Sequence, residues 1–296
     1  MWIGFILASA CVLAFYDLAK KASVRENAVL PVLLISALCG AIAYIGGLAA
    51  AGSLVSSVAC DGRTFALTGV KTLIVATSWI LTYTALKTLP ITIATPIRAS
   101  APALVFLVAF FLYGERPTLV QALGMFCVFV GYWAFNWAGR HEGIDFLRNR
   151  AVWFALGGMA CSAASSLWDK YLFQVAALKV ETVQFWFQVD LVCFYGLLLA
   201  GQRLLGVACA PFEWRRTIPL VGVLLALADW LYFHGLAFPD VPISVASLMR
   251  RFSVVITFAL GAVFFHERNL RRKSLALVAI LVGVAFLCVR SACDRG

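Results

Sequence analysis

The chain has 296 residues, of which 63% are hydrophobic and only 13% are charged, and its formal net charge is +10. A mean hydropathy of +0.94 excludes a soluble globular domain and indicates an integral membrane protein. The positive charge does not indicate nucleic-acid binding, because the basic residues lie mostly at the ends of apolar runs, where they set orientation and contact anionic lipid headgroups. The nine cysteines include no CxxC and no Cys/His cluster, so we expect no metal and no cofactor.

Apolar runs long enough to cross a bilayer follow one another along the whole chain. The first lacks the positive segment of a cleavable signal, so we expect it to be a retained span. Turn signals mark several boundaries: Pro90 and Pro242 each begin a span, and polar stretches at 113–118 and 266–272 interrupt two others. We therefore predict ten transmembrane helices, at 2–20, 29–51, 64–86, 91–113, 118–138, 151–173, 181–200, 217–238, 242–265 and 271–290.

The second half of the sequence repeats the first at a constant offset of 152 residues, without gaps. Matching charged residues carry this conclusion, because only 13% of the chain is charged and such matches are rare by chance. The matching pairs are Asp17 and Asp169, Ala85 and Ala237, Pro90 and Pro242, Ile91 and Ile243, Ala94 and Ala246, Arg98 and Arg250, Glu115 and Glu267, Arg116 and Arg268, and Gly131 and Gly283.

We expect two five-helix repeats, at residues 1–140 and 151–296. Five is an odd number, so the second repeat enters the membrane from the side opposite to the first. The predicted fold class is therefore an all-α integral membrane protein with ten transmembrane helices in two inverted five-helix repeats. This construction is typical of secondary transporters, whose substrate sites lie near the midplane where the repeats meet.

The stretch "ALKTLPITIATPIRASAPALVFLVAFFLYGERPTLVQALGMFCVFVGYWAF" at 85–135 resembles the conserved half of an EamA-type repeat of the drug/metabolite transporter superfamily. The stretch "GLAFPDVPISVASLMRRFSVVITFALGAVFFHERNLRRKSLALVAILVGVAFL" at 235–287 resembles its second copy. The resemblance implies ten helices and alternating access. It does not choose a substrate, because the superfamily moves amino acids, sugars, nucleotide sugars, phosphorylated trioses and drugs.

Three arginines stand inside predicted spans, where a charge is costly and therefore typical of function. Arg98 and Arg250 occupy equivalent depths, and Arg251 has no counterpart because residue 99 is Ala. Guanidinium groups bind carboxylate or phosphate in a bidentate manner, so we predict an anion site that also includes Thr95 and Ser247. The three positions are similar to the phosphate-holding basic residues of the triose-phosphate translocator branch, although that branch uses Lys at two of them.

Carboxylates in the apolar runs support a second interpretation, in which the arginines form structural ion pairs. Asp17 and Asp169 recur at the repeat offset, which favours a structural or gating pair. Asp190 and Asp229 have no acidic counterparts, and each is a candidate proton carrier or a partner of an arginine. His234 is either a proton relay or an interfacial residue with a local hydrogen bond.

Aromatic residues near the predicted spans are either interface anchors or candidates to stack on a substrate. Trp168, Trp230 and Tyr232 are the ones we expect to be able to face a cavity. The leading functional hypothesis is a secondary active transporter for a small organic anion or zwitterion, such as a phosphorylated metabolite, with proton coupling or substrate antiport. The alternative is an exporter of amino acids or other neutral or amphipathic metabolites.

An enzyme such as a lipid-phosphate transferase is disfavoured, because the sequence has no DDxxD-like cluster and no long polar loop to carry a catalytic site. We expect a multi-pass protein of a bacterial inner membrane. Its orientation stays open: the concentration of Lys and Arg in alternate loops places both termini outside, whereas members of the resembling superfamily commonly have both in the cytoplasm.

Overall fold

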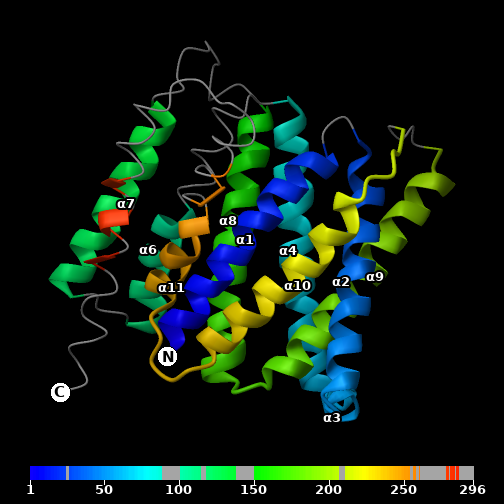
Figure 1. Ribbon diagram of the computed structural model, residues 1–296, viewed down its shortest axis with the longest axis horizontal. Coiled ribbons are helices and arrows are strands. Elements are labelled where there is room, and N and C mark those ends of the chain that lie inside the picture. Colours follow the sequence, from blue (N-terminus) through cyan, green and yellow to red (C-terminus); the bar gives the residue numbers. More distant parts are fainter. Residues whose placement is uncertain are drawn as a thin grey trace. The chain divides into compact units, whose positions relative to one another are not determined.

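The structure is a computed structural model, shown in Figure 1. It describes residues 1–24, 27–88, 101–114, 118–137, 150–206 and 211–253, and further along the chain residues 256, 257, 260, 278, 279, 281–283, 285 and 286. The described residues form helices joined by short connections. The helices are α1 (Trp2–Val24), α2 (Val29–Ala50), α3 (Leu54–Val58), α4 (Gly62–Thr88), α6 (Ala101–Tyr113), α7 (Leu119–Trp137), α8 (Arg150–Lys170), the π-helix η1 (Tyr171–Val175), α9 (Val180–Leu204), α10 (Thr217–Leu236) and α11 (Ile243–Arg250).

Within the described residues, six helical segments are long and apolar enough to cross a membrane. They lie at 2–24, 29–50, 62–82, 150–175, 180–204 and 217–236. Each coincides with a predicted span to within a few residues. The chain is thus an all-helical, multi-pass integral membrane protein.

Local chemistry explains several helix ends. Asp61 precedes α4 and its carboxylate accepts a hydrogen bond from the Thr64 backbone N–H at 3.1 Å, which satisfies one of the helix's unpaired donors. Gly52 follows α2 with φ of +68°, a conformation that terminates helices and that glycine adopts without strain. Pro242 stands immediately before α11 in an extended conformation, since proline fixes φ and cannot donate a backbone hydrogen bond.

The described chain divides into two compact units. The first comprises residues 1–76 and 171–238, and the second comprises residues 77–170 and 239–296. Each unit therefore contains part of both sequence repeats.

In the first unit, the helices pack in the order α1, α10, α2 and α9 (Figure 1). Helices α1 and α10 are antiparallel: the Ser9 hydroxyl donates to the Ala228 carbonyl at 2.6 Å, and the Ser23 hydroxyl donates to the Thr217 hydroxyl at 2.6 Å. Gly222 of α10 lies against α2, where an added Cβ would overlap the Ser36 carbonyl. Small residues permit this close approach of two backbones, as in other membrane helix pairs.

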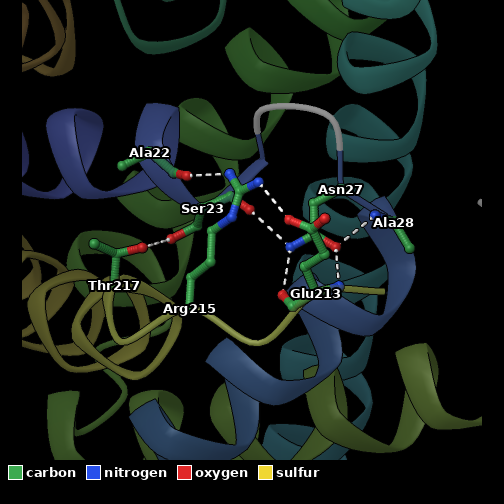
Figure 2. A network of polar contacts seen from close by, with 7 residues as sticks. All are labelled: Ala22, Ser23, Asn27, Ala28, Glu213, Arg215 and Thr217. Atoms are coloured by element: carbon green, nitrogen blue, oxygen red, sulfur yellow. Dashed lines mark hydrogen bonds and ion pairs between the residues drawn. The ribbon is translucent and has the colours of Figure 1, made fainter. Parts of the chain in front are cut away.

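A polar network ties the α1–α2 corner to the segment before α10 (Figure 2). The side-chain amide of Asn27 donates to the Glu213 carbonyl at 2.8 Å and accepts from the Glu213 backbone N–H at 2.9 Å. Arg215 donates to the Ala22 carbonyl at 2.7 Å and pairs with the Glu213 carboxylate at 2.9 Å. The network joins two connections that the sequence separates by nearly 190 residues.

In the second unit, α6 packs against α8 and α11, and α11 also contacts α7 and α8. Gly158 of α8 lies against the last turns of α4, whose Ser78 hydroxyl donates to the Gly158 carbonyl at 2.8 Å. Glycine is required here by space, because an added Cβ would lie 3.1 Å from the Thr82 backbone nitrogen.

The positions of α2 and α9 agree with the repeat offset proposed from the sequence. Adding 152 to the bounds of α2 predicts a helix at 181–202, and α9 occupies 180–204. Helices α2 and α9 contact each other in an antiparallel manner, since Tyr44 reaches Glu181 while Gly40 lies near Gln188. That is the relation expected between equivalent helices of an inverted repeat.

Candidate functional site

Lys71, on α4, directs its ammonium group toward aromatic rings of two other helices, α9 and α10. This side chain is 2% exposed. Its Nζ lies 4.7 Å from the centre of the Phe187 ring and 4.5 Å from that of the Phe233 ring. The negative faces of both rings stabilise the cation in a region that water does not reach.

Asp190 lies on the same face of α9 as Phe187, one helical turn away. It forms a hydrogen bond with Thr72, the residue that follows Lys71. Its other carboxylate oxygen, Oδ2, is buried and has no hydrogen-bond partner among the described residues. The turn of α4 at residues 71–72 therefore faces the turn of α9 at residues 187–190.

Helix α10 contributes Asp229, which is 7% exposed and lies one turn before Phe233. A fully buried amide lies nearby: Nε2 of Gln184 donates to the Ala226 carbonyl at 2.6 Å, one turn before Asp229, while its Oε1 has no partner among the described residues. Gln188 is also buried, one turn further along α9. The first unit thus holds a polar interior formed by α4, α9 and α10, which we call the Lys71 cluster: Lys71, Thr72, Gln184, Gln188, Asp190 and Asp229.

His234 lies at the end of α10, in a separate group. Its Nδ1 is 2.9 Å from the Trp230 carbonyl oxygen, and its Nε2 is 3.3 Å from the Glu181 carboxylate. The Trp230 ring lies 4.3 Å from the imidazole, between ring centres. These contacts fix His234 and Trp230 against each other at the helix end.

Tyr232, on the same helix, is 1% exposed and packs against Phe233. Asp17, on α1, is half-buried, and the neighbouring Lys20 ammonium lies 5.3 Å from the centre of the Tyr16 ring. Tyr232 and Asp17 both belong to the first unit.

The second unit holds the predicted arginine pair. Arg250 ends α11 and Arg251 follows it as the C-cap residue, and both are half-buried. Seven of the eight residues of α11 are buried, Ser244 and Ser247 among them. Trp168, half-buried, and Asp169, 4% exposed, lie in α8 of the same unit. Arg98 and Thr95 lie outside the described residues.

The sequence analysis assigned no function to Lys71, Thr72, Gln184 or Gln188. A signal for Lys71 was present: at the offset of 152 its counterpart is Val223, just as Asp190 corresponds to Leu38 and Asp229 to Thr77. These three charges, none of which has a counterpart at the repeat offset, all belong to the Lys71 cluster. Among the described residues there is no group of three or more His, Cys, Asp or Glu side chains able to hold a metal ion.

Comparison with known proteins agrees with the membrane fold. Residues 1–137 match the EamA-like transporter family. A crystal structure described only as that of a protein superposes with a TM-score of 0.77 at 16% sequence identity, over 97% of this chain and 97% of the other. No curated protein matches the sequence. This match confirms the resemblance of the stretch at 85–135 to an EamA-type repeat, and residues 1–137 are similar to the EamA-like transporter family.

Proposed function

We propose that the protein is a secondary active transporter that carries a small organic anion or zwitterion across the membrane by alternating access. The observation that supports transport is the match of residues 1–137 to a transporter family, in a chain with at least six helices able to span a membrane. The repeats proposed at 1–140 and 151–296 both contribute to each compact unit, an intertwining compatible with an inverted duplication. Helical spans suit the bacterial inner membrane as its location.

The preference for an anion rests on Arg250 and Arg251. They stand at the end of α11, whose other seven residues are buried, and are themselves half-buried, so their charges are partly desolvated. Two adjacent guanidinium groups supply several fixed donors with the geometry of a carboxylate or phosphate. The narrower assignment to a phosphorylated metabolite rests on the resemblance of Arg98, Arg250 and Arg251 to the triose-phosphate translocator branch.

One observation supports the alternative, an exporter of neutral or amphipathic metabolites. Arg250, Arg251 and Asp169 belong to the same unit, and each has an interaction within the chain. If these interactions neutralise the arginines permanently, the substrate needs no negative charge.

Ligand-dependent thermal stability separates the two functions. Purified protein would be heated with phosphorylated sugars, carboxylates, amino acids or organic cations, alongside Arg250→Ala and Arg251→Ala. The exposed Arg203→Ala, at the end of α9, is a control for loss of one positive charge. We expect anions to raise the melting temperature of the natural protein and of the control, but not of the α11 variants. Stabilisation by neutral or cationic compounds alone, unchanged in the α11 variants, would support the exporter.

A further inference from the structure

We infer that Asp190 is a proton-binding site within the membrane region, and that the transporter loads and releases this proton during its cycle. The inference rests on the proposed transport function for its role, and on the Lys71 cluster for the site itself. The two oxygens of the Asp190 carboxyl group have different surroundings. One side of Asp190 is hydrogen-bonded to Thr72, whereas Oδ2 is buried without a partner among the described residues.

A buried carboxylate oxygen without a hydrogen-bond donor carries an uncompensated desolvation cost. Protonation lowers that cost, because a neutral acid is less costly to desolvate than a carboxylate, and Oδ2 is the oxygen available to carry the proton. The contact with Thr72 is compatible with both states: the hydroxyl can direct its one proton to the carboxylate, or keep it on the Thr68 carbonyl oxygen, 3.2 Å away, while Asp190 is a neutral acid. The geometry therefore suits an acid that alternates between two protonation states.

The charges around Asp190 favour the same conclusion. With every group ionised, the cluster has two negative charges, on Asp190 and Asp229, and one positive charge, on Lys71. The ammonium lies between the Phe187 and Phe233 rings, which are one helical turn from Asp190 and Asp229 respectively, so one positive charge stands among two carboxyl groups. A proton on one carboxyl makes the cluster neutral, and Asp190, half-buried as a residue, has the buried oxygen without a partner among the described residues.

The structure describes few other titratable groups on the helices that pack against α9. Helix α2, which packs against α9, has no charged residue, and its titratable groups are Cys39 and Tyr44, the latter directed to the Glu181 backbone. On α10 the remaining titratable groups are Tyr232, which is buried against Phe233, and His234, which contacts the Glu181 side chain and the Trp230 carbonyl at the helix end. On α4 the other basic residue of the first unit is Arg63, in the first turn of the helix.

The proposed step is a simple proton transfer. In the loaded state an O–H bond exists at Oδ2, and the cluster is neutral. When the site opens to water, that bond breaks, the proton passes to water and the carboxylate is left in the same cluster as the Lys71 ammonium. Uptake from the opposite aqueous side restores the acid, so one proton crosses the membrane in each cycle.

Infrared difference spectroscopy tests the site without any substrate. The full-length protein in lipid would be titrated over a range of pH values, and the C=O stretch of a protonated carboxylic acid would be followed. We expect a titrating band that disappears in Asp190→Asn and persists in Asp190→Glu at a shifted position. Asp240→Asn is a matched control, since Asp240 is exposed and Asn tolerates its φ of +59°. Loss of one band in Asp190→Asn, with an unchanged circular dichroism spectrum, would support the inference.

Three results would overturn it: no titrating acid band, a band that survives in folded Asp190→Asn, or a band that responds to sodium ions rather than to pH. A second experiment addresses the role in transport, with any compound that stabilises the protein. In vesicles, Asp190→Asn should lose uptake driven by a pH gradient and keep exchange of labelled for unlabelled compound. Equal loss of both activities would exclude proton coupling through Asp190. Failure to find a transported compound would count against the proposed function, while the infrared result would still decide whether the proton site exists.

Discussion

The side chain of Asn27 pairs with both backbone groups of Glu213 (Figure 2). It accepts a hydrogen bond from the Glu213 N–H at 2.9 Å and donates one to the Glu213 carbonyl at 2.8 Å. Asn27 is 5% exposed, and its amide also donates to the Ser23 carbonyl at 3.1 Å. One buried side chain thus satisfies two backbone groups in a connection between helices.

Replacing Asn27 with Ala should lower the free energy of unfolding by about 2 kcal/mol, because buried backbone groups lose their partners. The measurement is the thermal melting of the detergent-purified protein. Arg215→Ala is the control in the same network: its ion pair with Glu213 is largely exposed, so its effect should be only about 0–1 kcal/mol. Equal effects of the two substitutions would contradict the assigned importance of Asn27.

Gly222 is predicted to be intolerant of any side chain. An alanine Cβ would overlap the Ser36 carbonyl of α2 and approach the Gly40 backbone nitrogen to 2.8 Å, so α2 and α10 would have to separate. We expect Gly222→Ala to lower stability by about 3 kcal/mol or more. Gly46→Ala on α2 meets no atom within 4 Å and should be neutral or stabilising by about 0.5–1 kcal/mol. A well-folded Gly222→Ala with an unchanged melting temperature would refute the close packing of these helices.

Neighbouring glycines of α8 provide a comparison in the second unit. A Cβ at Gly158 would lie 3.2 Å from the Ser78 carbonyl oxygen and even closer to Thr82, whereas at Gly157 the nearest atom is the flexible end of Leu81 at 3.3 Å. Gly158→Ala should therefore destabilise the protein by about 1–3 kcal/mol, and Gly157→Ala by much less. The ratio of folded to aggregated protein after purification, together with melting curves, measures the difference. The reverse order would show that α4 and α8 pack differently.

Lys71 and Asp190 should be energetically coupled. Lys71→Met removes the cation and leaves the carboxylates of the cluster without it, so this variant should be clearly less stable than the natural protein. Adding Asp190→Asn should recover part of the loss, because one of the uncompensated charges disappears. A double-mutant cycle from melting curves gives the interaction free energy, which we expect to exceed about 0.5 kcal/mol. Strictly additive effects would mean that the two groups do not sense each other.

Much of the fold follows from sequence patterns that act locally. The apolar run from Val29 and the turn chemistry at Pro242 predict where α2 and α11 begin, because span length and proline geometry are set by nearby residues. The short helix α3 and the π-helix η1 were not predicted. A five-residue helix has almost no periodicity, and η1 continues an apolar run without a local signal.

The candidate site was less accessible to prediction from the sequence. The charges of Asp190 and Asp229 were selected because they break the repeat, yet nothing in the sequence indicated that Lys71 lies between Phe187 and Phe233. Such contacts depend on which helices are neighbours, and that depends on packing between distant parts of the chain. Arg250 and Arg251 were identified because a charged side chain within an apolar span has a high free-energy cost, and such a position can be recognised in a single sequence.

Transport by the purified protein in lipid vesicles is the most direct test of the central claim. Vesicles preloaded with an unlabelled anion selected by thermal stabilisation would be diluted into the labelled compound, with the natural protein, Arg250→Ala, Arg251→Ala and Arg203→Ala in parallel. The account predicts accumulation of label by the natural protein and by Arg203→Ala, with at least a tenfold loss in a folded α11 variant. Accumulation of a neutral or cationic compound that is unchanged in the α11 variants, with none for any anion, would contradict it.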